Sequence, residues 1–286
     1  MALVSGREIL AAAREHGYAV PAFNIFNLEM LQATLGAAVA ERSPVVIQVS
    51  PRTIEYASLG DIHGLGPIAA IAETLADPVP VPVVLHLDHG HDIDACERAL
   101  DVGFTSVMYD GASLPFDENV VWTRKVVECA HHANASAEAE LGQVGHAGDG
   151  HDDHERTNPE LAARFVADTG VDALAVSIGT VHGMKQTGAK VDLDLVRALR
   201  AAVDVPLVMH GSSGVDDETL VAAIGAGITK VNLSTALQHA FMDALRASAV
   251  LPGHETDARA VLGDARAAVE QAARHRIRIL GSDGKA

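Results

Sequence analysis

The sequence has little that would direct it to a nucleic acid, a membrane or an oxidising compartment. It contains 21 lysines and arginines against 38 aspartates and glutamates, a formal net charge of −17, and its cations form no run. Because binding to nucleic acids or anionic lipids needs clustered cations, both kinds of partner are excluded. No apolar run approaches the ~20 residues that span a bilayer, and residues 1–14 lack the pattern of a signal peptide. A soluble, cytoplasmic protein is therefore expected.

Cysteine is almost absent too. Cys96 and Cys129 both fall in helix-like stretches and form no CxxC pair, so neither a disulfide framework nor a thiolate zinc site is supported. Two buried free thiols are expected. No linker rich in serine, proline or glycine divides the chain, and one domain over residues 1–286 is the simplest interpretation.

Short apolar runs rich in β-branched residues alternate with stretches of helical apolar spacing along the chain. The runs cover residues 19–25, 45–50, 83–89, 106–110, 135–141, 174–178, 207–210 and 230–233. The helical stretches include residues 28–40, 93–100, 120–130, 159–169, 193–202 and 218–225. This alternation predicts βα units with a parallel sheet, and eight such units in about 250 residues favour a closed (β/α)8 TIM barrel.

Two segments depart from this alternation. Residues 142–158 form a long polar loop after the fifth predicted strand, and loops longer than about 12–15 residues are usually functional or mobile. Residues 258–286 are rich in alanine and arginine with helical spacing. We expect this tail to be a helical extension that packs on the barrel or on a neighbouring subunit.

Three histidines, His89, His182 and His210, stand at the ends of three different predicted strands, and a glycine follows each one. In a (β/α)8 barrel the carboxyl ends of the strands form the active site, so these side chains should converge at one mouth. Three imidazoles with a vacant fourth position are typical of catalytic zinc sites, where the metal acts as a Lewis acid. A single histidine at a strand end more often makes a packing hydrogen bond, but three favour a metal site.

The remaining histidines are interpreted differently. His86, His131, His132 and His239 are expected to have structural roles, the last three within helices. The loop 142–158 holds further candidate ligands, which are His146, His151, His154, Asp149, Asp152 and Asp153. Their spacing matches no specific metal site, so a solvated loop is favoured over a second metal.

Two polar segments follow the last two predicted strands. They are residues 211–214 (Gly-Ser-Ser-Gly) and 232–235 (Asn-Leu-Ser-Thr). In barrels of this kind the loops after strands seven and eight frequently hold a phosphate group with backbone N–H and hydroxyl donors. The pairing of the two segments favours a phosphate site over two simple turns.

In these residues the chain resembles the class II, zinc-dependent ketose-bisphosphate aldolases, which include fructose- and tagatose-bisphosphate aldolases. The resemblance covers nearly the whole chain. In chain order it rests on residues 20–24 (Val-Pro-Ala-Phe-Asn), 87–90 (Leu-Asp-His-Gly), 138–142 (Glu-Ala-Glu-Leu-Gly), 157–159 (Thr-Asn-Pro), 178–183 (Ile-Gly-Thr-Val-His-Gly), 210–211 (His-Gly), 230–232 (Lys-Val-Asn) and 280–282 (Leu-Gly-Ser).

The resemblance implies a role for each matching residue. His89, His182 and His210 would bind Zn²⁺, with Glu140 near a mobile metal, and Asp88 would donate the proton to the aldehyde oxygen. The phosphate of dihydroxyacetone phosphate, with a monovalent cation (Na⁺ or K⁺) beside it, would be held by Gly183, Gly211, Ser213, Ser234 and Thr235. Asn232 would contact the hydroxyl-bearing carbons, and Asn24 and Ser50 would line the pocket.

The chain departs from the family pattern in its loops. Gly148 stands where the family has a glutamate that exchanges a proton with the enediolate, so Asp149 or a neighbour in the loop is expected to replace it. Gln186 stands where the family has a phosphate-facing lysine, and Lys185, one position earlier, is expected to bind the phosphate in its place. Ser234 stands where an acidic or amide residue is common. These differences leave the identity of the sugar open.

Three functions are compatible with these residues. The favoured one is a zinc-dependent aldolase that cleaves a phosphorylated ketose into dihydroxyacetone phosphate and an aldehyde, a step in which zinc would stabilise the enediolate charge without a Schiff-base lysine. The missing glutamate keeps open a different metal-dependent sugar-phosphate enzyme, a hydrolase or isomerase, and a non-catalytic sugar-phosphate sensor. The resemblance also implies a homo-oligomer, a dimer or tetramer.

Overall fold

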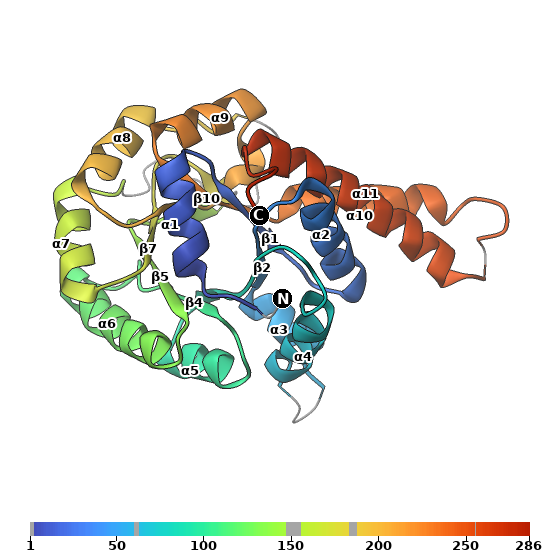
Figure 1. Ribbon diagram of the computed structural model, residues 1–286, viewed down its shortest axis with the longest axis horizontal. Helices are drawn as coiled ribbons and strands as arrows, with labels where there is room; N and C mark the ends of the chain where they lie inside the picture. Colours follow the sequence, from blue (N-terminus) through green and yellow to red (C-terminus); the bar gives the residue numbers. More distant parts are fainter. Residues whose placement is uncertain (1–2, 60–62, 147–155, 183–187, 255) are drawn as a thin grey trace.

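The chain is seen in a computed structural model, which describes residues 3–59, 63–146, 156–182, 188–254 and 256–286. The barrel strands in this part of the chain are β1 (Val20–Asn24), β2 (Val45–Val49), β3 (Val83–Gly90), β4 (Ser106–Tyr109), β5 (Ser136–Leu141), β7 (Ala173–Val176), β9 (Leu207–Met209) and β10 (Ile228–Leu233). They are parallel and close in the order β1, β10, β9, β7, β5, β4, β3, β2. Each overlaps one of the predicted runs, so the predicted (β/α)8 barrel is confirmed (Figure 1).

Helices connect the barrel strands and surround them. They are α2 (Leu28–Glu41), α3 (Pro51–Ala57), α4 (Leu65–Ala76), α5 (Ile93–Asp101), α6 (Phe116–His132), α7 (Pro159–Thr169), α8 (Leu193–Ala202) and α9 (Asp217–Ala226). Polar residues just after the strands start several of them. The side chain of Asn27, for example, accepts a hydrogen bond from the Met30 N–H, and that of Asp92 from the Ala95 N–H. Such caps satisfy backbone donors that the first helical turn leaves unpaired.

Alternate residues of each strand face the surrounding helices and the barrel interior. Outward residues such as Phe23 and Val107 belong to a large apolar layer between strands and helices. Inward residues near the amino ends, including Val46, Val84 and Val208, form a smaller apolar cluster. Because side chains i and i+2 share one face of a strand, the next inward positions lie closer to the carboxyl ends. Those positions are polar: Gln48, His86 and His210.

Helix α1 (Gly6–His16), which precedes the first strand, was not predicted. Ser5 caps it, and Ile9, Leu10 and Ala13 join the apolar cluster inside the barrel. The Gly6 N–H donates to Ser136 Oγ at the first residue of β5. Helix α1 therefore closes the amino-terminal end of the barrel, and the carboxyl ends of the strands are left to form the mouth (Figure 1).

The prediction that residues 142–158 form a loop is partly wrong. Its early part contains a short strand, β6 (Gly145–His146), which pairs in parallel with β8 (Val181–His182) outside the barrel sheet. The pairing brings the segment after β5 beside the segment after β7, so two loops of the mouth are joined by backbone hydrogen bonding. Residues 147–155, which include Asp149 and most of the other candidate ligands of this loop, lie outside the described residues.

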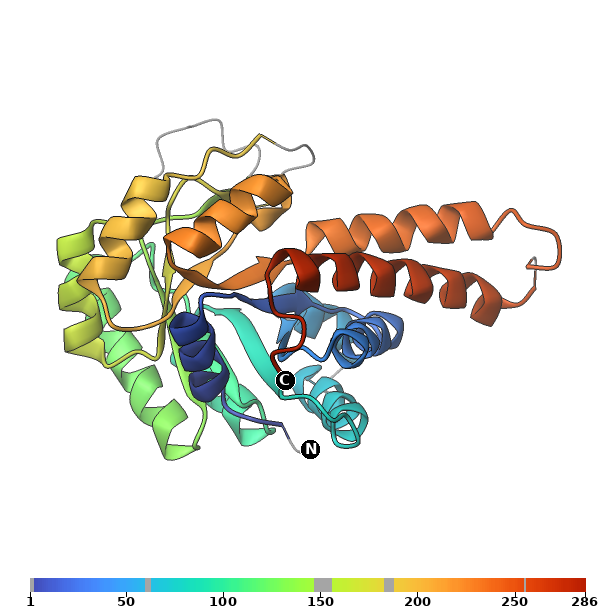
Figure 2. The same cartoon turned by 45° about the horizontal axis from the view of Figure 1, so that its top comes forward.

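The expected C-terminal extension is part of a helical hairpin. Helix α10 (Thr235–Ser248) follows β10 and packs against α11 (Ala258–Ile279), and the pair projects from one side of the barrel (Figures 1 and 2). Near its carboxyl end α11 packs on α2, where Arg274 and Arg278 both donate to Glu41 at 2.6 Å. The tail thus packs on the barrel's own helices, one of the two expected placements.

The cysteine prediction is only half correct. Both thiols are free, but Cys96 is buried and Cys129, on the surface of α6, is partly exposed. None of the helices in the described parts of the chain combines the length and the apolar character needed to cross a bilayer.

Candidate active site

Asp88 occupies an inward position of β3 and is only 5% exposed. Its Oδ2 accepts a hydrogen bond from Asn24 Nδ2 at 2.7 Å, and its Oδ1 accepts one from Asn232 Nδ2 at 3.3 Å. Gln48 holds Asn24 in turn, with 3.1 Å between Gln48 Nε2 and Asn24 Oδ1. Burial opposes ionisation of Asp88, but the positive charge of His89 and the hydrogen bond from Asn24 favour it, and the pKa of Asp88 is lowered. The result is an ionised carboxylate that two amides keep in one orientation.

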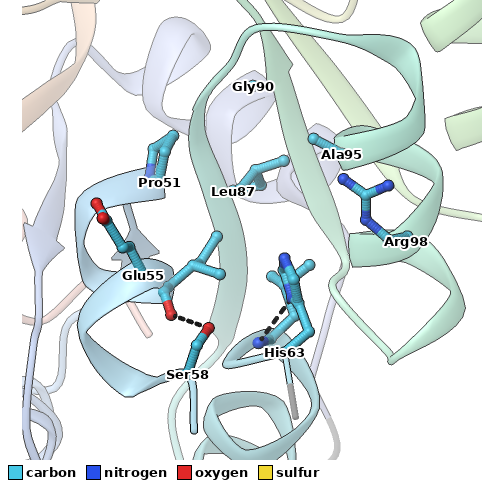
Figure 3. Close-up of a pocket in the computed structure, with 10 residues that line it drawn as sticks. Pro51, Glu55, Ser58, His63, Leu87, Gly90, Ala95 and Arg98 are labelled. Atoms are coloured by element: carbon cyan, nitrogen blue, oxygen red, sulfur yellow. Dashed lines mark hydrogen bonds between the residues drawn. The ribbon is translucent and has the colours of Figure 1, made fainter. Parts of the chain in front are cut away.

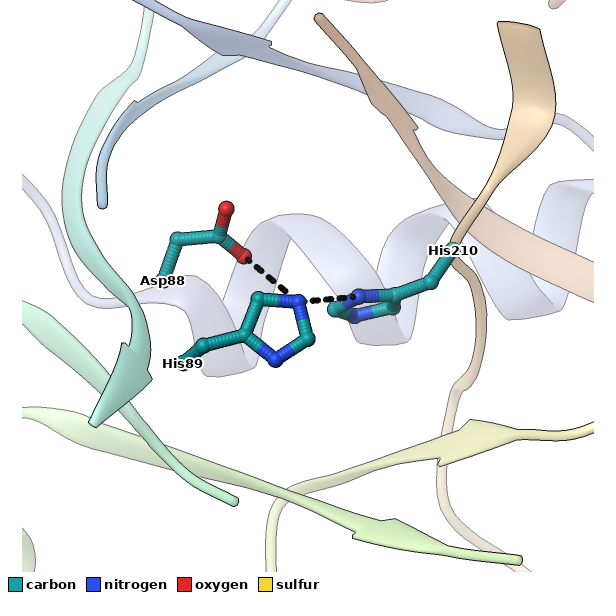
Figure 4. Close-up of side chains that lie close together, drawn as sticks. All are labelled: Asp88, His89 and His210. Carbon is teal, nitrogen blue, oxygen red and sulfur yellow. Dashed lines mark hydrogen bonds and ion pairs between the residues drawn. The ribbon is translucent and has the colours of Figure 1, made fainter. Parts of the chain in front are cut away.

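His89 and His210 meet beside this carboxylate (Figure 4). His89 Nε2 lies 3.1 Å from His210 Nδ1, with the ring planes at 82°, and 3.9 Å from Asp88 Oδ1. His89 also has a left-handed backbone with φ of 54°. This conformation costs a non-glycine residue about 1–3 kcal/mol and concentrates at functional sites. The strained turn aims the His89 ring across the mouth toward His210.

Each of these histidines contacts a carboxylate through its other ring nitrogen. Asp110, directly after β4, places Oδ2 at 2.7 Å from His89 Nδ1, and Glu138 in β5 places Oε1 at 3.0 Å from His210 Nε2. Because a carboxylate only accepts hydrogen bonds, His89 Nδ1 and His210 Nε2 carry the hydrogens. Contacts of this kind orient histidines that bind metals. They direct His89 Nε2 and His210 Nδ1 toward each other.

The charge around His89 is unusually negative. Burial disfavours its protonated form, but Asp88 and Asp110 outweigh this effect and raise the pKa of His89 to about 9. A metal cation bound by His89 would have to displace that proton. The carboxylates that favour the protonated imidazole would also attract the cation.

Glu140, two residues beyond Glu138 on β5, is also buried. Its Oε1 accepts a hydrogen bond from the Val144 N–H at 3.1 Å, whereas its Oε2 is buried with no hydrogen-bond partner among the described residues. Burial, reinforced by the negative charge of Asp110, raises the pKa of Glu140 to about 8. A buried oxygen without a partner at the mouth of the barrel is a candidate ligand.

These side chains fit a zinc ion. Two overlapping groups, Asp88, His89, His210 and His89, Asp110, Glu140, each offer ligand atoms within 4.8 Å of one another. Imidazole and carboxylate are the usual donors of catalytic zinc, and two nitrogens bound to one zinc at about 2.0–2.1 Å are about 3.3 Å apart in tetrahedral geometry. The observed 3.1 Å between His89 Nε2 and His210 Nδ1 is close to that value. The imidazole of His182, the third predicted ligand, lies outside the described part of the chain.

A pocket of about 350 Å³ opens next to Asn24. Three residues predicted to bind substrate, Asn24, Ser50 and Ser234, line it together with Arg52 and Gln238, which were not predicted. Ser234 Oγ accepts a hydrogen bond from Gln238 Nε2 at 3.0 Å. Because Asn24 also donates to Asp88, the pocket leads directly to the buried carboxylate.

The predicted phosphate residues are only partly described. Gly183 and Lys185 lie outside the described residues, as does Gln186. Gly211 has a φ of 65°, and a Cβ there would approach the Val181 backbone to 2.8–2.9 Å, so only glycine fits this contact with β8. Ser213 lies in the short 3-10 helix η1 (Ser212–Gly214), and Thr235 is the first residue of α10.

Sequence analysis missed several polar residues of this site, namely Gln48, Asp110, Glu138, Lys230 and Arg52. Three of them could have been found from strand periodicity, because Gln48, Glu138 and Lys230 lie two residues before the predicted Ser50, Glu140 and Asn232 and share their strand face. Asp110 ends a predicted strand and carried the same signal as the histidines. Arg52 lies in a helix, where the strand-end argument does not apply.

A second pocket, of about 340 Å³, lies on the outer side of β3 (Figure 3). Its apolar floor includes Leu87 and Ile54, and its rim carries Glu55, His63 and Arg98. Leu87 precedes Asp88 and belongs to the layer between strands and helices, so this pocket and the barrel mouth lie on opposite faces of the strand.

Comparisons with known proteins agree with the fold and identify the family. The family profile described as fructose-bisphosphate aldolase class-II matches residues 4–285. The chain is 40% identical over 289 residues to the D-tagatose-1,6-bisphosphate aldolase subunit GatY of Klebsiella oxytoca, covering 100% of both sequences. The YdjI aldolase from Escherichia coli K12 superposes with a TM-score of 0.87 at 33% identity, covering 99% of each chain. A fructose-bisphosphate aldolase from Campylobacter jejuni shares the fold, with a TM-score of 0.86 at 24% identity over 100% of this chain and 97% of that one.

Proposed function

The chain belongs to the class II fructose-bisphosphate aldolase family and is a carbon–carbon lyase, and from this premise we propose that it is a zinc-dependent ketose-bisphosphate aldolase. It cleaves a fructose- or tagatose-1,6-bisphosphate-like ketose reversibly into dihydroxyacetone phosphate and an aldehyde. The observation that carries the proposal is the meeting of Asp88 and His89, at the carboxyl end of β3, with His210, directly after β9. Membership of a lyase family favours this reaction over the hydrolase, isomerase and sensor alternatives.

His89, His182 and His210 hold the zinc ion in this proposal, with Glu140 as an additional carboxylate ligand. A zinc ion at this position supplies a Lewis acid that polarises the ketone and stabilises the negative charge formed on cleavage. Asp110 and Glu138 keep the rings of His89 and His210 in the orientation that presents His89 Nε2 and His210 Nδ1.

Asp88 moves the proton of the reaction. When the bond between C3 and C4 breaks, its electron pair passes to the ketone fragment, the C4 hydroxyl becomes an aldehyde, and its proton goes to Asp88. In the condensation direction Asp88 returns this proton to the aldehyde oxygen. The lowered pKa of Asp88 keeps it ionised and ready to accept, and the hydrogen bonds from Asn24 and Asn232 hold its oxygens in place.

The ketone fragment keeps its phosphate at the loops after β9 and β10. Gly211 and Ser213 supply donors from the first loop, and Ser234 and Thr235 from the second, while Asn232 contacts the hydroxyl-bearing carbons. Gly183, Lys185 and a monovalent cation complete this site. Asp149, in the loop after β6, takes the place of the family's enediolate base.

The pocket beside Asn24 accommodates the aldehyde half of the substrate. Arg52 and Ser50 line it, and within the described part of the chain no carboxylate forms an ion pair with Arg52. In a protein with a net charge of −17, a guanidinium without an acidic partner at this place favours an anionic group on the far end of the ketose. This feature supports a bisphosphate over a monophosphate.

The test is a coupled assay that follows dihydroxyacetone phosphate release from fructose 1,6-bisphosphate, tagatose 1,6-bisphosphate and their 1-phosphates. We expect release from at least one bisphosphate, its loss with a chelator and its return with zinc. Absence of release from every ketose phosphate by zinc-loaded protein would overturn the proposed function. Release that persists after complete metal removal would overturn its zinc dependence.

A further inference from the structure

A lysine and a glutamate lie buried inside the barrel behind the candidate metal site, and neither touches substrate in the mechanism above. Lys230 of β10 is 1% exposed and donates to Glu138 Oε2 at 2.7 Å. Glu138 is 2% exposed, and its second oxygen, Oε1, faces His210 Nε2 at 3.0 Å. The pair therefore joins the floor of the barrel interior to a predicted zinc ligand.

The pair belongs to a longer column of buried polar groups. Lys230 Nζ lies 3.5 Å from His86 Nε2, and His86 Nδ1 lies 2.7 Å from Ser106 Oγ. Ser136 Oγ donates to Ser106 at 2.9 Å and accepts from the Gly6 N–H at 3.2 Å. The column runs from the first residue of α1 to His210, through the whole interior of the barrel.

Stability alone does not explain a buried ion pair at this place. Removing both charges from water costs several kcal/mol per ion, and apolar replacements of similar volume are often neutral or stabilising. Apolar side chains occupy the neighbouring interior positions of the barrel, where Met108 pairs in register with Glu138 and Val208 with Lys230. Apolar side chains could therefore also have filled the positions of Lys230 and Glu138.

The contacts of His210 show what the pair does. His210 is fully buried, so water cannot set the orientation of its ring. Glu138 fixes the hydrogen on Nε2, which leaves Nδ1 as the nitrogen that faces His89. Lys230 binds the other oxygen of Glu138 and so prevents the carboxylate from rotating away from the imidazole.

We propose that Glu138 and Lys230 are positioning residues that fix the tautomer and the direction of His210, and so raise the affinity of the site for its metal. The inference rests on the proposed metal site, but it goes beyond it by assigning a role to two residues that are not ligands. Outer carboxylates of this kind typically change metal affinity about 10- to 100-fold.

The test compares two double variants that differ only in the acceptor offered to His210. Glu138→Gln/Lys230→Met removes both charges but keeps an amide oxygen that can accept the His210 N–H. Glu138→Met/Lys230→Met removes the charges and the acceptor at nearly the same side-chain volume. Both avoid the unpaired buried charge of the single variants, which is expected to destabilise the fold strongly. Ser106→Ala, lower in the same column, is the control for a general loss of buried polarity.

Co²⁺ serves as the probe, because its affinity is measured by competition with a chelator and its visible absorption reports the ligand geometry. Melting temperatures without metal verify folding, and long-range ¹H–¹⁵N NMR of the imidazoles reports which nitrogen of His210 carries hydrogen. We expect the Gln/Met and Ser106→Ala variants to stay within about threefold of the wild type. The Met/Met variant should bind Co²⁺ about 10- to 100-fold more weakly, with a changed spectrum and a mixed tautomer.

Equal affinities and spectra for the Gln/Met and Met/Met variants would overturn the positioning role while leaving the metal site intact. A wild-type protein that binds neither Co²⁺ nor Zn²⁺ would overturn the metal site of the proposed function, and this inference with it. If the Met/Met variant does not fold, the tautomer of His210 in the Gln/Met variant decides. The proposal requires hydrogen on Nε2, as in the wild type, and hydrogen on Nδ1 would contradict it.

Discussion

Two carboxylates hold two histidines of the same site by the same contact, yet their surroundings differ. Asp110 and His89 stand at the rim of the barrel mouth, with side chains 19% and 20% exposed. Glu138 and His210 stand in the interior, with side chains 3% and 0% exposed. The interior carboxylate is paired with Lys230, whereas Asp110 is supported by the Ala112 N–H.

The difference shows that burial determines which partner a carboxylate requires to stay ionised. At the rim, water and a backbone donor compensate the negative charge of Asp110. Inside the barrel the side chains are buried from solvent, so a carboxylate there must be paired with a cation or become neutral. Glu138 is paired with a cation, Lys230. Glu140 has no lysine or arginine partner among the described residues, and its raised pKa favours the neutral form.

The strongest test of the rim and interior pairs is removal of the histidines themselves. His89→Ala and His210→Ala should each lower the rate of cleavage at least about 10³-fold, because each removes a ligand to the ion that stabilises the transition state. Zinc content and kcat/KM measure the effect. The comparison predicts that the two variants behave alike although one histidine is at the rim and the other is buried. Full zinc content in either variant would exclude that histidine as a ligand.

Asp88 should separate chemistry from metal binding. Asp88→Asn keeps the size of the side chain and its place between Asn24 and Asn232 but cannot take up the hydroxyl proton. We expect a loss of 10²–10⁴ in kcat at unchanged zinc content, the range typical of a positioned acid–base group. A loss of less than about tenfold would show that another group moves this proton.

The third prediction uses Glu140, the interior carboxylate without a cation. Its pKa is about 8 in the folded protein and near 4.5 when unfolded, so the folded state binds more protons between these values. The contribution of Glu140 to the free energy of unfolding of the metal-free protein therefore falls as the pH rises from about 4.5 to 8 and is constant above that.

Glu140→Gln removes this dependence. At pH 9 the metal-free variant should gain about 5–10 °C in melting temperature over the wild type, and the difference should vanish near pH 4.5. His89 and the other titrating groups are present in both proteins, so the difference isolates Glu140. Equal melting curves at pH 9 would show that Glu140 is ionised without cost in the wild type.

How much of this molecule the sequence predicts differs between strands and loops. Apolar runs such as residues 83–89 predict all eight barrel strands, because a strand buried on both faces must be apolar on its outer face along its whole length. Polar residues that end such an apolar run, as Asp88 and His89 do, predict the position of the mouth, because the carboxyl ends of the strands form it. Helix α1 was not predicted because it precedes the first strand and so does not belong to the alternation of strands and helices.

The second layer of the site was harder to predict. Glu138 and Lys230 lie 92 residues apart in the chain, and their contact depends on which strands face each other across the barrel. Periodicity gives each residue an inward direction, but it does not give the partner on the opposite strand. The pairing of β6 with β8 is hidden for a similar reason, since two-residue strands leave no periodic signal.

A fourth prediction compares the rim carboxylate directly with its buried counterpart. Asp110→Asn can still contact His89 but no longer fixes the hydrogen on Nδ1, and we expect Co²⁺ affinity to fall about 10-fold, at the lower end of the range for such carboxylates. Because Asp110 is partly exposed and forms an ion pair with no lysine of the described residues, the melting temperature without metal should change little. A large loss of stability would show that the rim pair is as integral to the fold as the interior pair.

The smallest expected effect concerns Arg52, which belongs to the rim and to the wall of the substrate pocket. Arg52→Gln keeps a long polar side chain but removes the charge, and no ion pair with a described residue is broken. A charge-assisted hydrogen bond is worth about 1.5–3 kcal/mol, and solvent exposure places this one at the lower limit, so KM for a bisphosphate should rise about 10-fold at nearly constant kcat. The matched substrate is the ketose 1-phosphate, whose KM should not change, because it lacks the distal anion. Equal effects on both substrates would place Arg52 outside the distal pocket, and the rim would then contribute to catalysis only through Asp110 and His89.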